Sequence, residues 1–219
     1  MSRIALLDLD GTLVDSAPDI HAALDRLMAS RGLPRFTRGE VVHMIGDGVR
    51  VLIERALAAR GLPFDPAALE QFLPDYEAHA LDLTRPFPGI PEALEALRAE
   101  GWRLAVCTNK PVQAARIVLE RLGLMPLLDG LAGGDSFAVR KPDPRHLLGT
   151  LGLMGVPEGV VPPGTAMLGD HSNDIRSARG AGIAPVFCAW GYGLPEMADG
   201  APVAERPQDL PALMARLAA

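Results

Sequence analysis

Arg3-Ile-Ala-Leu-Leu-Asp-Leu-Asp-Gly-Thr-Leu-Val-Asp-Ser16 opens on an apolar run that breaks off at two aspartates and a glycine. The run predicts a buried β-strand that ends in a tight turn. Alternation along the strand would point Asp8 and Asp10 to the same side, where two close carboxylates repel each other. A helix cap needs only one such side chain, whereas a divalent cation offsets the repulsion of both. The pair therefore indicates a ligand site.

Three further apolar runs resemble the first one, and segments with a helical period lie between them. The runs are Trp102–Thr108, Thr165–Gly169 and Pro185–Trp190, and the helical segments include Ile90–Glu100 and Pro111–Leu122. Strands that alternate with helices are typical of parallel strands joined by crossovers. We therefore expect an α/β fold with a doubly wound, mostly parallel, Rossmann-like sheet.

Polar residues end several of these strands. Thr108 and Asp170 follow their apolar runs as Asp8 and Asp10 follow the first one. The carboxyl ends of the strands form the ligand crevice of an open α/β sheet, so these residues should meet at one edge. Asp170 and Asp174 add a second acidic pair, and an oxygen-rich acidic cluster suits Mg²⁺. The sequence thus predicts a magnesium site at this edge.

Residues 16–84 show only helical patterns. Three positions carry helix-start signals: Ser16, Thr37 with Glu40, and Asp65-Pro66. The stiff segment Arg85-Pro-Phe-Pro-Gly89 returns the chain to the sheet and would form a hinge together with Leu13–Ser16. We therefore expect an α-helical domain of residues 16–84, inserted after the first strand of an α/β core made of residues 1–15 and 85–219.

The overall charge and the cysteines limit the possible partners. The chain has 219 residues, with 21 basic against 27 acidic side chains and a formal net charge of −6, which disfavours broad capture of nucleic acid or an anionic membrane. Cys107 and Cys188 lie inside apolar runs, where buried free thiols are expected. No apolar stretch approaches the roughly 18 residues of a membrane helix. We expect a soluble cytoplasmic protein, monomeric or homodimeric.

Four segments, in their order along the chain, resemble the haloacid dehalogenase (HAD) superfamily of aspartate-nucleophile phosphotransferases. They are Asp8-Leu-Asp-Gly-Thr-Leu-Val-Asp-Ser16, Thr108, Lys141 in Lys-Pro-Asp-Pro, and Gly169-Asp170 through Asp174. The first segment is highly specific, whereas the threonine and the lysine are weak signals alone, because a lone lysine in a loop is usually solvated surface. The resemblance covers nearly the whole chain and implies that residues 16–84 form a cap.

The resemblance implies a catalytic role for each acidic residue. Asp8 would be the nucleophile that becomes an aspartyl phosphate, and Asp10 would act first as general acid and then as general base. Mg²⁺ would be held by the carboxylates of Asp8 and Asp170 and by the main-chain carbonyl of Asp10. Asp174 would support these ligands through water or through Lys141.

The same resemblance implies a phosphate-binding set. Thr108 and the main-chain N–H of Asn109 would bind phosphate oxygens. Lys141 would offset the negative charge of Asp8 and of the phosphoryl group. These residues complete the predicted catalytic group of Asp8, Asp10, Thr108 and Lys141.

Within the superfamily, several segments look most like the phosphoglycolate phosphatases of bacteria. They are Asp47-Gly-Val-Arg50, Thr108-Asn-Lys-Pro111, Gly133-Gly-Asp135 and Gly169-Asp170 with Asn173-Asp-Ile175. This resemblance implies hydrolysis of a small phosphorylated metabolite, with 2-phosphoglycolate as substrate and glycolate and phosphate as products. Sugar phosphates, pyrophosphate and nucleoside monophosphates stay open as alternatives, because the cap selects the leaving group.

Two residues have no fixed role in this pattern. Arg50 opens a helix after Gly46-Asp-Gly48, where free N–H groups favour anions, so we consider it as the reader of the substrate's second charge. A surface ion pair is an equally good interpretation of Arg50. We expect His171 at an exposed or supporting position rather than in contact with substrate, because the mechanism already has its acid and base.

A receiver-type signalling domain is the non-enzyme alternative. It also groups acidic residues, Mg²⁺, a threonine and a lysine around a phosphorylated aspartate. By resemblance, however, a receiver has its acidic pair in one strand and its phosphorylated aspartate in a later one, in a much shorter chain. The order Asp8, Thr108, Lys141, Asp170 therefore favours the enzyme.

Overall fold

A six-stranded sheet forms the centre of the molecule, which is described for residues 3–217 by a computed structural model. The strands are β1 (Arg3–Leu7), β4 (Trp102–Cys107), β5 (Gly130–Ala132), β6 (Ala166–Gly169), β7 (Ala184–Cys188) and β8 (Val203–Ala204). They lie in the order β5-β4-β1-β6-β7-β8, and all neighbours are parallel. The expected parallel α/β sheet is confirmed. The sequence reading missed β5 and β8, because two or three residues carry no periodic signal.

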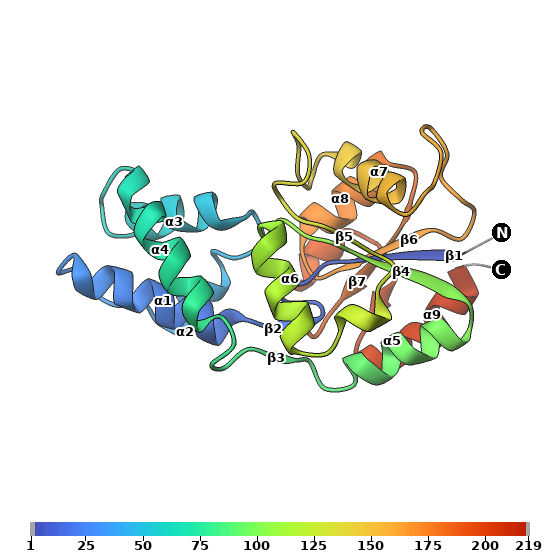
Figure 1. Ribbon diagram of the computed structural model, residues 1–219, viewed down its shortest axis with the longest axis horizontal. Helices are drawn as coiled ribbons and strands as arrows, with labels where there is room; N and C mark the ends of the chain where they lie inside the picture. Colours follow the sequence, from blue (N-terminus) through green and yellow to red (C-terminus); the bar gives the residue numbers. More distant parts are fainter. Residues whose placement is uncertain (1–2, 218–219) are drawn as a thin grey trace.

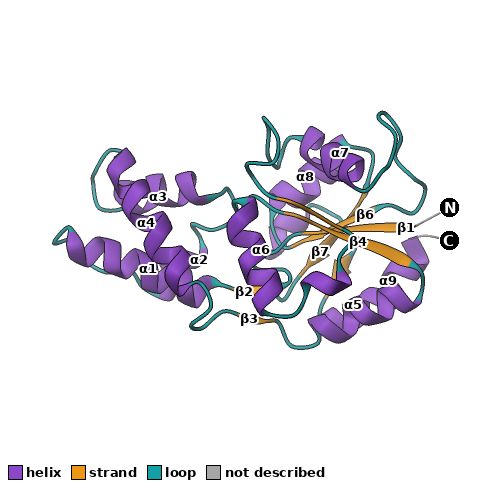
Figure 2. Cartoon of the chain, viewed as in Figure 1, coloured by secondary structure: helices purple, strands orange, loops and turns teal. Residues whose placement is uncertain are grey.

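Helices cover both faces of this sheet, as Figures 1 and 2 show. The helices are α5 (Ile90–Ala99), α6 (Val112–Arg121) and α9 (Leu210–Leu217) on one face, and α7 (Pro144–Leu153) and α8 (Ser172–Gly180) on the other. The central strand β1 serves both faces, because successive side chains point in opposite directions. Ala5 and Leu7 pack into the first cluster, whereas Ile4 and Leu6 pack into the second. Burial on both faces explains why the strand is apolar after Arg3.

The inserted residues fold into helices that lie at one end of the molecule, away from the sheet (Figure 1). They are α1 (Ala17–Ser30), α2 (Arg38–Val42), α3 (Val49–Ala58) and α4 (Pro66–His79). Their apolar sides form a separate core, with Leu24, Ile53 and Phe72 among its fully buried members. We call residues 16–84 the cap. The exact domain boundaries stay a prediction, but the separate core supports a cap that packs by itself.

Two short strands connect the cap to the sheet. β2 (Val14–Asp15) and β3 (Arg85–Pro86) pair in antiparallel fashion, with Val14 opposite Pro86. These are the two segments expected to form a hinge. The chain therefore leaves the sheet and returns to it through a single two-stranded ribbon.

Most of the predicted helix starts are confirmed, and one is wrong in its detail. Thr37 and Glu40 form the expected capping box, and Asp65 caps α4 by accepting the N–H of Ala67. Ser16 precedes α1, but its hydroxyl makes no capping bond. That hydroxyl instead donates to Asp10, with 2.6 Å between the oxygens. The backbone of Ser16 is helical, with φ −98° and ψ −7°, instead of the extended conformation that a capping side chain needs, which accounts for the difference.

Cys107 and Cys188 are buried free thiols, as predicted. Between residues 3 and 217, none of the helices has the combination of length and apolar character that crossing a bilayer requires.

Candidate active site

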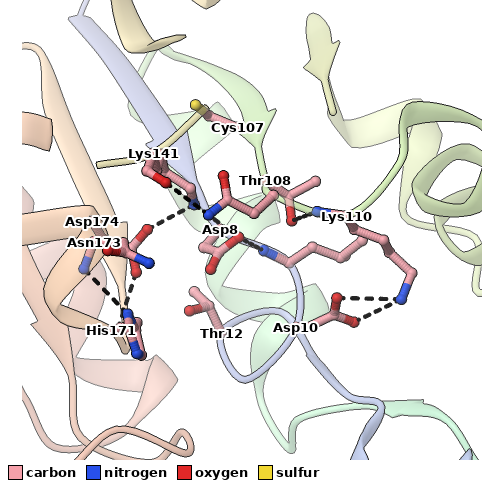
Figure 3. A network of polar contacts seen from close by, with 12 residues as sticks. Asp8, Asp10, Thr12, Cys107, Thr108, Lys110, Lys141, His171, Asn173 and Asp174 are labelled. Atoms are coloured by element: carbon pink, nitrogen blue, oxygen red, sulfur yellow. Dashed lines mark hydrogen bonds and ion pairs between the residues drawn. The ribbon is translucent and has the colours of Figure 1, made fainter. Parts of the chain in front are cut away.

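Asp8 lies directly after β1, at the carboxyl end of the sheet, and its side chain is almost fully buried. One carboxylate oxygen accepts the main-chain N–H of Leu9 at 2.8 Å and lies 2.9 Å from Nζ of Lys141. Figure 3 shows Asp8 at the centre of the network. Burial raises the pKa of Asp8 to about 6, although the ammonium group of Lys141 acts in the opposite direction. The predicted nucleophile and its predicted counter-charge are therefore in direct contact.

Lys141 also contacts the second predicted acidic pair. Its Nζ donates to Asp174 at 2.7 Å, and both side chains are 1 % exposed. Burial disfavours the charged amine, but the carboxylates of Asp174 and Asp8 outweigh it and raise the pKa of Lys141. Lys141 is therefore a fixed cation between two carboxylates. This geometry agrees with the expected link from Asp174 to the metal site through Lys141.

Three carboxylates converge around one point. Ligand oxygens of Asp8, Asp170 and Asp174 lie within 4.8 Å of one another. Asp170 is held in place by the hydroxyl of Thr12 and the main-chain N–H of Tyr192, each at 2.8 Å. Burial, followed by repulsion from Asp8, raises the pKa of Asp170 to about 7. Three buried carboxylates beside one ammonium leave uncompensated negative charge, so the cluster fits a divalent cation such as Mg²⁺.

A glycine makes this approach possible. Gly11 has a φ of +84°, and a Cβ at this position would lie 2.4 Å from the Asp170 carboxylate. Any other residue would therefore clash with the acidic cluster and strain the turn. The Asp8-Leu-Asp-Gly sequence thus brings the end of β1 against Asp170.

Asp10 lies one step further out and has different neighbours. Besides Ser16, its carboxylate contacts Nζ of Lys110 at 3.1 and 3.2 Å. Lys110 Nζ also donates to the phenol oxygen of Tyr76 at 2.6 Å, across the boundary between sheet and cap. Asp10, the predicted general acid and base, therefore lies next to the ammonium group of Lys110. Lys110 belongs to a segment that the resemblance includes, but no role was predicted for it. Tyr76 carried no sequence signal.

The chain has only two lysines, and both lie here. Lys110 and Lys141 are 7 % and 2 % exposed. The carboxylate of Asp10 and the phenol of Tyr76 outweigh the opposing effect of burial and raise the pKa of Lys110. Every other basic side chain of the sequence, histidines aside, is an arginine.

Thr108 and Asn109 follow β4 at the same edge. Both are buried, and the hydroxyl of Thr108 accepts the main-chain N–H of Lys110 at 3.2 Å. The side-chain amide of Asn109 donates to the carbonyls of Lys141 and Gly46, each at 3.0 Å. Thr108 lines the same cleft as Asp8 and Asp10, and its role in binding phosphate stays a prediction. Only a phosphate-binding role of the Asn109 main-chain N–H was predicted. Its side chain also makes a hydrogen bond from the core to Gly46 of the cap, which was not predicted.

A cap loop completes this edge of the site. Asn173 donates to Asp47 at 2.6 Å and to the carbonyl of Gly46 at 3.4 Å. The ring of His171 faces Gly46, where a Cβ would lie 2.9 Å from His171 Cδ2, and the ring caps α8 by accepting the N–H of Asn173. His171 is half-buried, and burial lowers its pKa. It lies at the cap contact and lines a second pocket together with Asp8, Asp10 and Asp170, so its supporting role stays a prediction.

Arg50 is not brought to the catalytic aspartates. Its guanidinium pairs with Glu54 at 2.9 Å and lies 4.7 Å from the ring centre of Phe64, and its side chain is 61 % exposed. The structure therefore favours the surface ion pair over a contact with substrate.

A cleft of about 600 Å³, including its open mouth, lies between Asp8 and Asp10 on one side and the cap on the other. Its outer wall is apolar and consists mainly of Ile20, Ile45, Val49, Leu52, Phe72, Leu73 and Ala114. The catalytic edge of the sheet therefore opens into a space that the cap covers with hydrocarbon.

Solved structures share this arrangement. A predicted phosphoglycolate phosphatase from Haemophilus somnus superposes with a TM-score of 0.85 and 28 % identity over 97 % of each chain. CbbY from Rhodobacter sphaeroides, solved in complex with phosphate, has a TM-score of 0.79 over 96 % of each chain at 24 % identity, which shows the fold alone.

Curated relatives are similar over almost the full chain. A phosphoglycolate phosphatase of Cereibacter sphaeroides is 43 % identical over 98 % of each chain, and one of Agrobacterium fabrum is 42 % identical over 88 % of this chain and 82 % of its own. Together with the fold, they define the class: the protein is a phosphoric monoester hydrolase. The family pattern described as haloacid dehalogenase-like hydrolase matches residues 5–188. The chain belongs to this family, which rejects the receiver-domain alternative.

Proposed function

We propose that the protein is a Mg²⁺-dependent phosphatase that hydrolyses 2-phosphoglycolate to glycolate and phosphate through an aspartyl phosphate on Asp8. The observation that carries the proposal is the buried group of Asp8, Asp170 and Asp174, in which Lys141 pairs with Asp8 and Asp174. The relatives support the substrate, because phosphoglycolate phosphatases are 43 % identical over nearly the whole chain.

In the first half-reaction, a carboxylate oxygen of Asp8 forms a bond to phosphorus while the bond from phosphorus to the ester oxygen breaks. Asp10 gives its proton to the departing alkoxide, which leaves as glycolate. Lys141 and the Thr108 hydroxyl stabilise negative charge on the phosphoryl oxygens. Their fixed positions at the sheet edge mean that little reorganisation is needed during the reaction.

In the second half-reaction, Asp10 takes a proton from a water molecule, and the resulting hydroxide attacks the phosphorus of the aspartyl phosphate. The bond between phosphorus and the Asp8 oxygen breaks, which releases phosphate and restores the carboxylate. Asp8, Asp170 and the main-chain carbonyl of Asp10 would hold Mg²⁺, with Asp174 behind them. When bound, Mg²⁺ neutralises the phosphate so that an anionic nucleophile can approach it.

The test is hydrolysis of a panel of small phosphate esters by the purified protein, with Mg²⁺ and with excess chelator. The panel contains 2-phosphoglycolate, a sugar phosphate, pyrophosphate and a nucleoside monophosphate. We expect the highest kcat/KM for 2-phosphoglycolate and loss of turnover in chelator, restored by Mg²⁺. Full activity in chelator would reject the role of the cation, and a higher kcat/KM for another ester would reject the substrate.

A further inference from the structure

One cationic side chain faces the cleft beside the leaving-group position. Among the described residues that line this space, Lys110 alone carries a full positive charge. The other lysine, Lys141, is held by Asp8 and Asp174 on the far side of the nucleophile. Arg50 pairs with Glu54 and does not line the cleft. The ammonium group of Lys110 is therefore the one cationic group among the described lining residues that could bind a second negative charge of a substrate.

We propose that Lys110 and Tyr76 form the binding site for a carboxylate of the leaving group. The substrate class that follows is a phosphate monoester whose carboxylate is one carbon away from the ester oxygen. This inference rests on the proposed function and replaces Arg50, the residue considered from the sequence, with a pair that spans core and cap.

The distances set the length of the spacer. To protonate the leaving oxygen, Asp10 must come within about 2.6–3.2 Å of it. Nζ of Lys110 lies 3.1 and 3.2 Å from the two Asp10 carboxylate oxygens. The ammonium group is therefore within two hydrogen-bond lengths of the leaving oxygen. A carboxylate attached through one carbon falls inside that range.

Tyr76 supplies the second contact. Its oxygen accepts from Lys110 at 2.6 Å, which leaves the phenol hydrogen free to donate to an anion. Burial raises the pKa of Tyr76, so the phenol keeps that hydrogen. The ammonium also lies 4.6 Å from the centre of the Tyr76 ring. A charged group and a neutral donor from two parts of the chain thus converge where the carboxylate would lie.

The rest of the cleft selects against the alternative substrates. Beyond Lys110, side chains such as Val49, Leu52 and Phe72 offer no hydrogen-bond partner. A sugar or nucleoside hydroxyl buried there loses its water without replacement, which costs roughly 10- to 100-fold in kcat/KM for each hydroxyl. The methylene group of glycolate loses nothing. Removal of water by these walls also strengthens the contact between ammonium and carboxylate.

The experiment compares 2-phosphoglycolate with ethyl phosphate, in which a methyl group replaces the carboxylate. We expect the wild-type protein to prefer 2-phosphoglycolate by roughly 100-fold in kcat/KM, a value typical of a buried charge-assisted contact. Lys110→Met should reduce this ratio to within about fivefold of unity, mainly through KM, and Lys110→Arg should restore part of it. Both esters need Asp10, so an effect of Lys110 on that residue cancels from the ratio.

Tyr76→Phe provides a milder variant that keeps the ring and the lysine. It should lower the ratio by roughly 5- to 10-fold, as expected for one hydrogen bond to a charged group. The matched control is Tyr192→Phe, because the Tyr192 hydroxyl is half-buried and bonds Asp15 and the N–H of Ala17 at the hinge, away from Lys110. That variant should change the rates of both esters equally and leave their ratio intact.

The outcomes separate the two proposals. If Lys110→Met and Tyr76→Phe slow both esters equally and leave the ratio unchanged, the carboxylate site is wrong while the phosphatase stands. The same conclusion follows if the wild-type protein prefers ethyl phosphate. If the wild-type protein hydrolyses no ester in Mg²⁺, the proposed function itself fails.

Discussion

The catalytic edge of the sheet and the cap face each other across one cleft, yet they are built from different interactions. At the edge, a buried lysine joins two carboxylates at 2.7 and 2.9 Å. The cap contributes apolar side chains, a phenol and the carbonyl of Gly46. Separating buried, paired charges is costly, whereas apolar contacts are non-directional. We therefore expect the sheet edge to hold the phosphoryl group, and the cap together with Lys110 to select the leaving group.

The largest effect should come from the nucleophile on the rigid side. Asp8→Asn should lower kcat by at least about 10³-fold, because an amide cannot form the acyl phosphate. Steady-state turnover of 2-phosphoglycolate measures it, and Asp82→Asn, at an exposed aspartate of the cap, is the control with the same chemical change. Near-normal activity of Asp8→Asn would contradict the assignment of Asp8 as the nucleophile of the catalytic edge.

Removal of the buried cation tests whether the edge is held together by charge. Lys141→Met should destabilise the protein by about 3–5 kcal/mol, because Asp8 and Asp174 then lose their common partner. Added Mg²⁺ should recover part of this loss by neutralising the same carboxylates. Chemical denaturation with and without Mg²⁺ measures both effects. A variant as stable as the wild type would mean that the carboxylates do not need the ammonium.

The acidic cluster also predicts how stability depends on pH. The pKa values of Asp8 and Asp170 are raised from 3.8 to about 6 and about 7. The metal-free native protein therefore binds more protons than the unfolded chain from about pH 4 to about pH 7, and its free energy of unfolding falls as the pH rises through this window. Mg²⁺ would bind the ionised carboxylates and should offset the loss.

Thermal melts in Mg²⁺ and in chelator, at pH 5 and at pH 8, measure this dependence. The gain in Tm from Mg²⁺ should be several degrees larger at pH 8, since about 1 kcal/mol corresponds to roughly 2–4 °C in a domain of this size. A gain that is equal at both pH values, or larger at pH 5, would contradict the assignment of Asp8 and Asp170 to the cation.

A smaller effect should come from the contacts that hold the cap on the core. Asn173→Ala removes the donor to Asp47 and should raise KM about 3- to 10-fold with less effect on kcat, because closure becomes less favourable. Asn173→Asp keeps the acceptor for Arg176 but sets a negative charge against Asp47, so its KM should rise further. Equal KM values for both variants and the wild type would mean that this contact does not control closure.

The smallest effect is expected at Arg50, an exposed residue of the cap. Arg50→Ala should leave KM for 2-phosphoglycolate within about twofold of the wild type, because an exposed ion pair with Glu54 contributes little. A KM increase of tenfold or more would show that Arg50 reaches the substrate after all.

The core could be predicted from the sequence because its signals are local. Apolar runs that end in Asp8, Thr108 and Asp170 predict parallel strands, and such strands deliver their last residues to one edge. Lys141 stands in a loop without periodicity, and only its place in the family pattern separated it from a surface lysine. The edge strands β5 and β8 were missed because they are too short to show a pattern.

The cap contacts could not be predicted, because they depend on how one body sits on another. Tyr76 is one of several buried apolar positions on α4, and nothing in its sequence neighbourhood indicates a hydrogen bond to Lys110. Arg50 has a signal, the helix start after two glycines, but tertiary packing turns it towards Glu54. Asn173 lies within a recognised segment, yet its partner Asp47 is 126 positions away.

The confinement of both lysines to the site has a practical consequence for labelling chemistry. Apart from the α-amino group, an amine-reactive reagent has no exposed primary amine to modify, because both lysines are almost fully buried. Acylation of Lys110 would require exposure of its side chain, and a saturating ligand should suppress it. The surface therefore offers no lysine to such a reagent, whereas Lys110 lies at the boundary between core and cap.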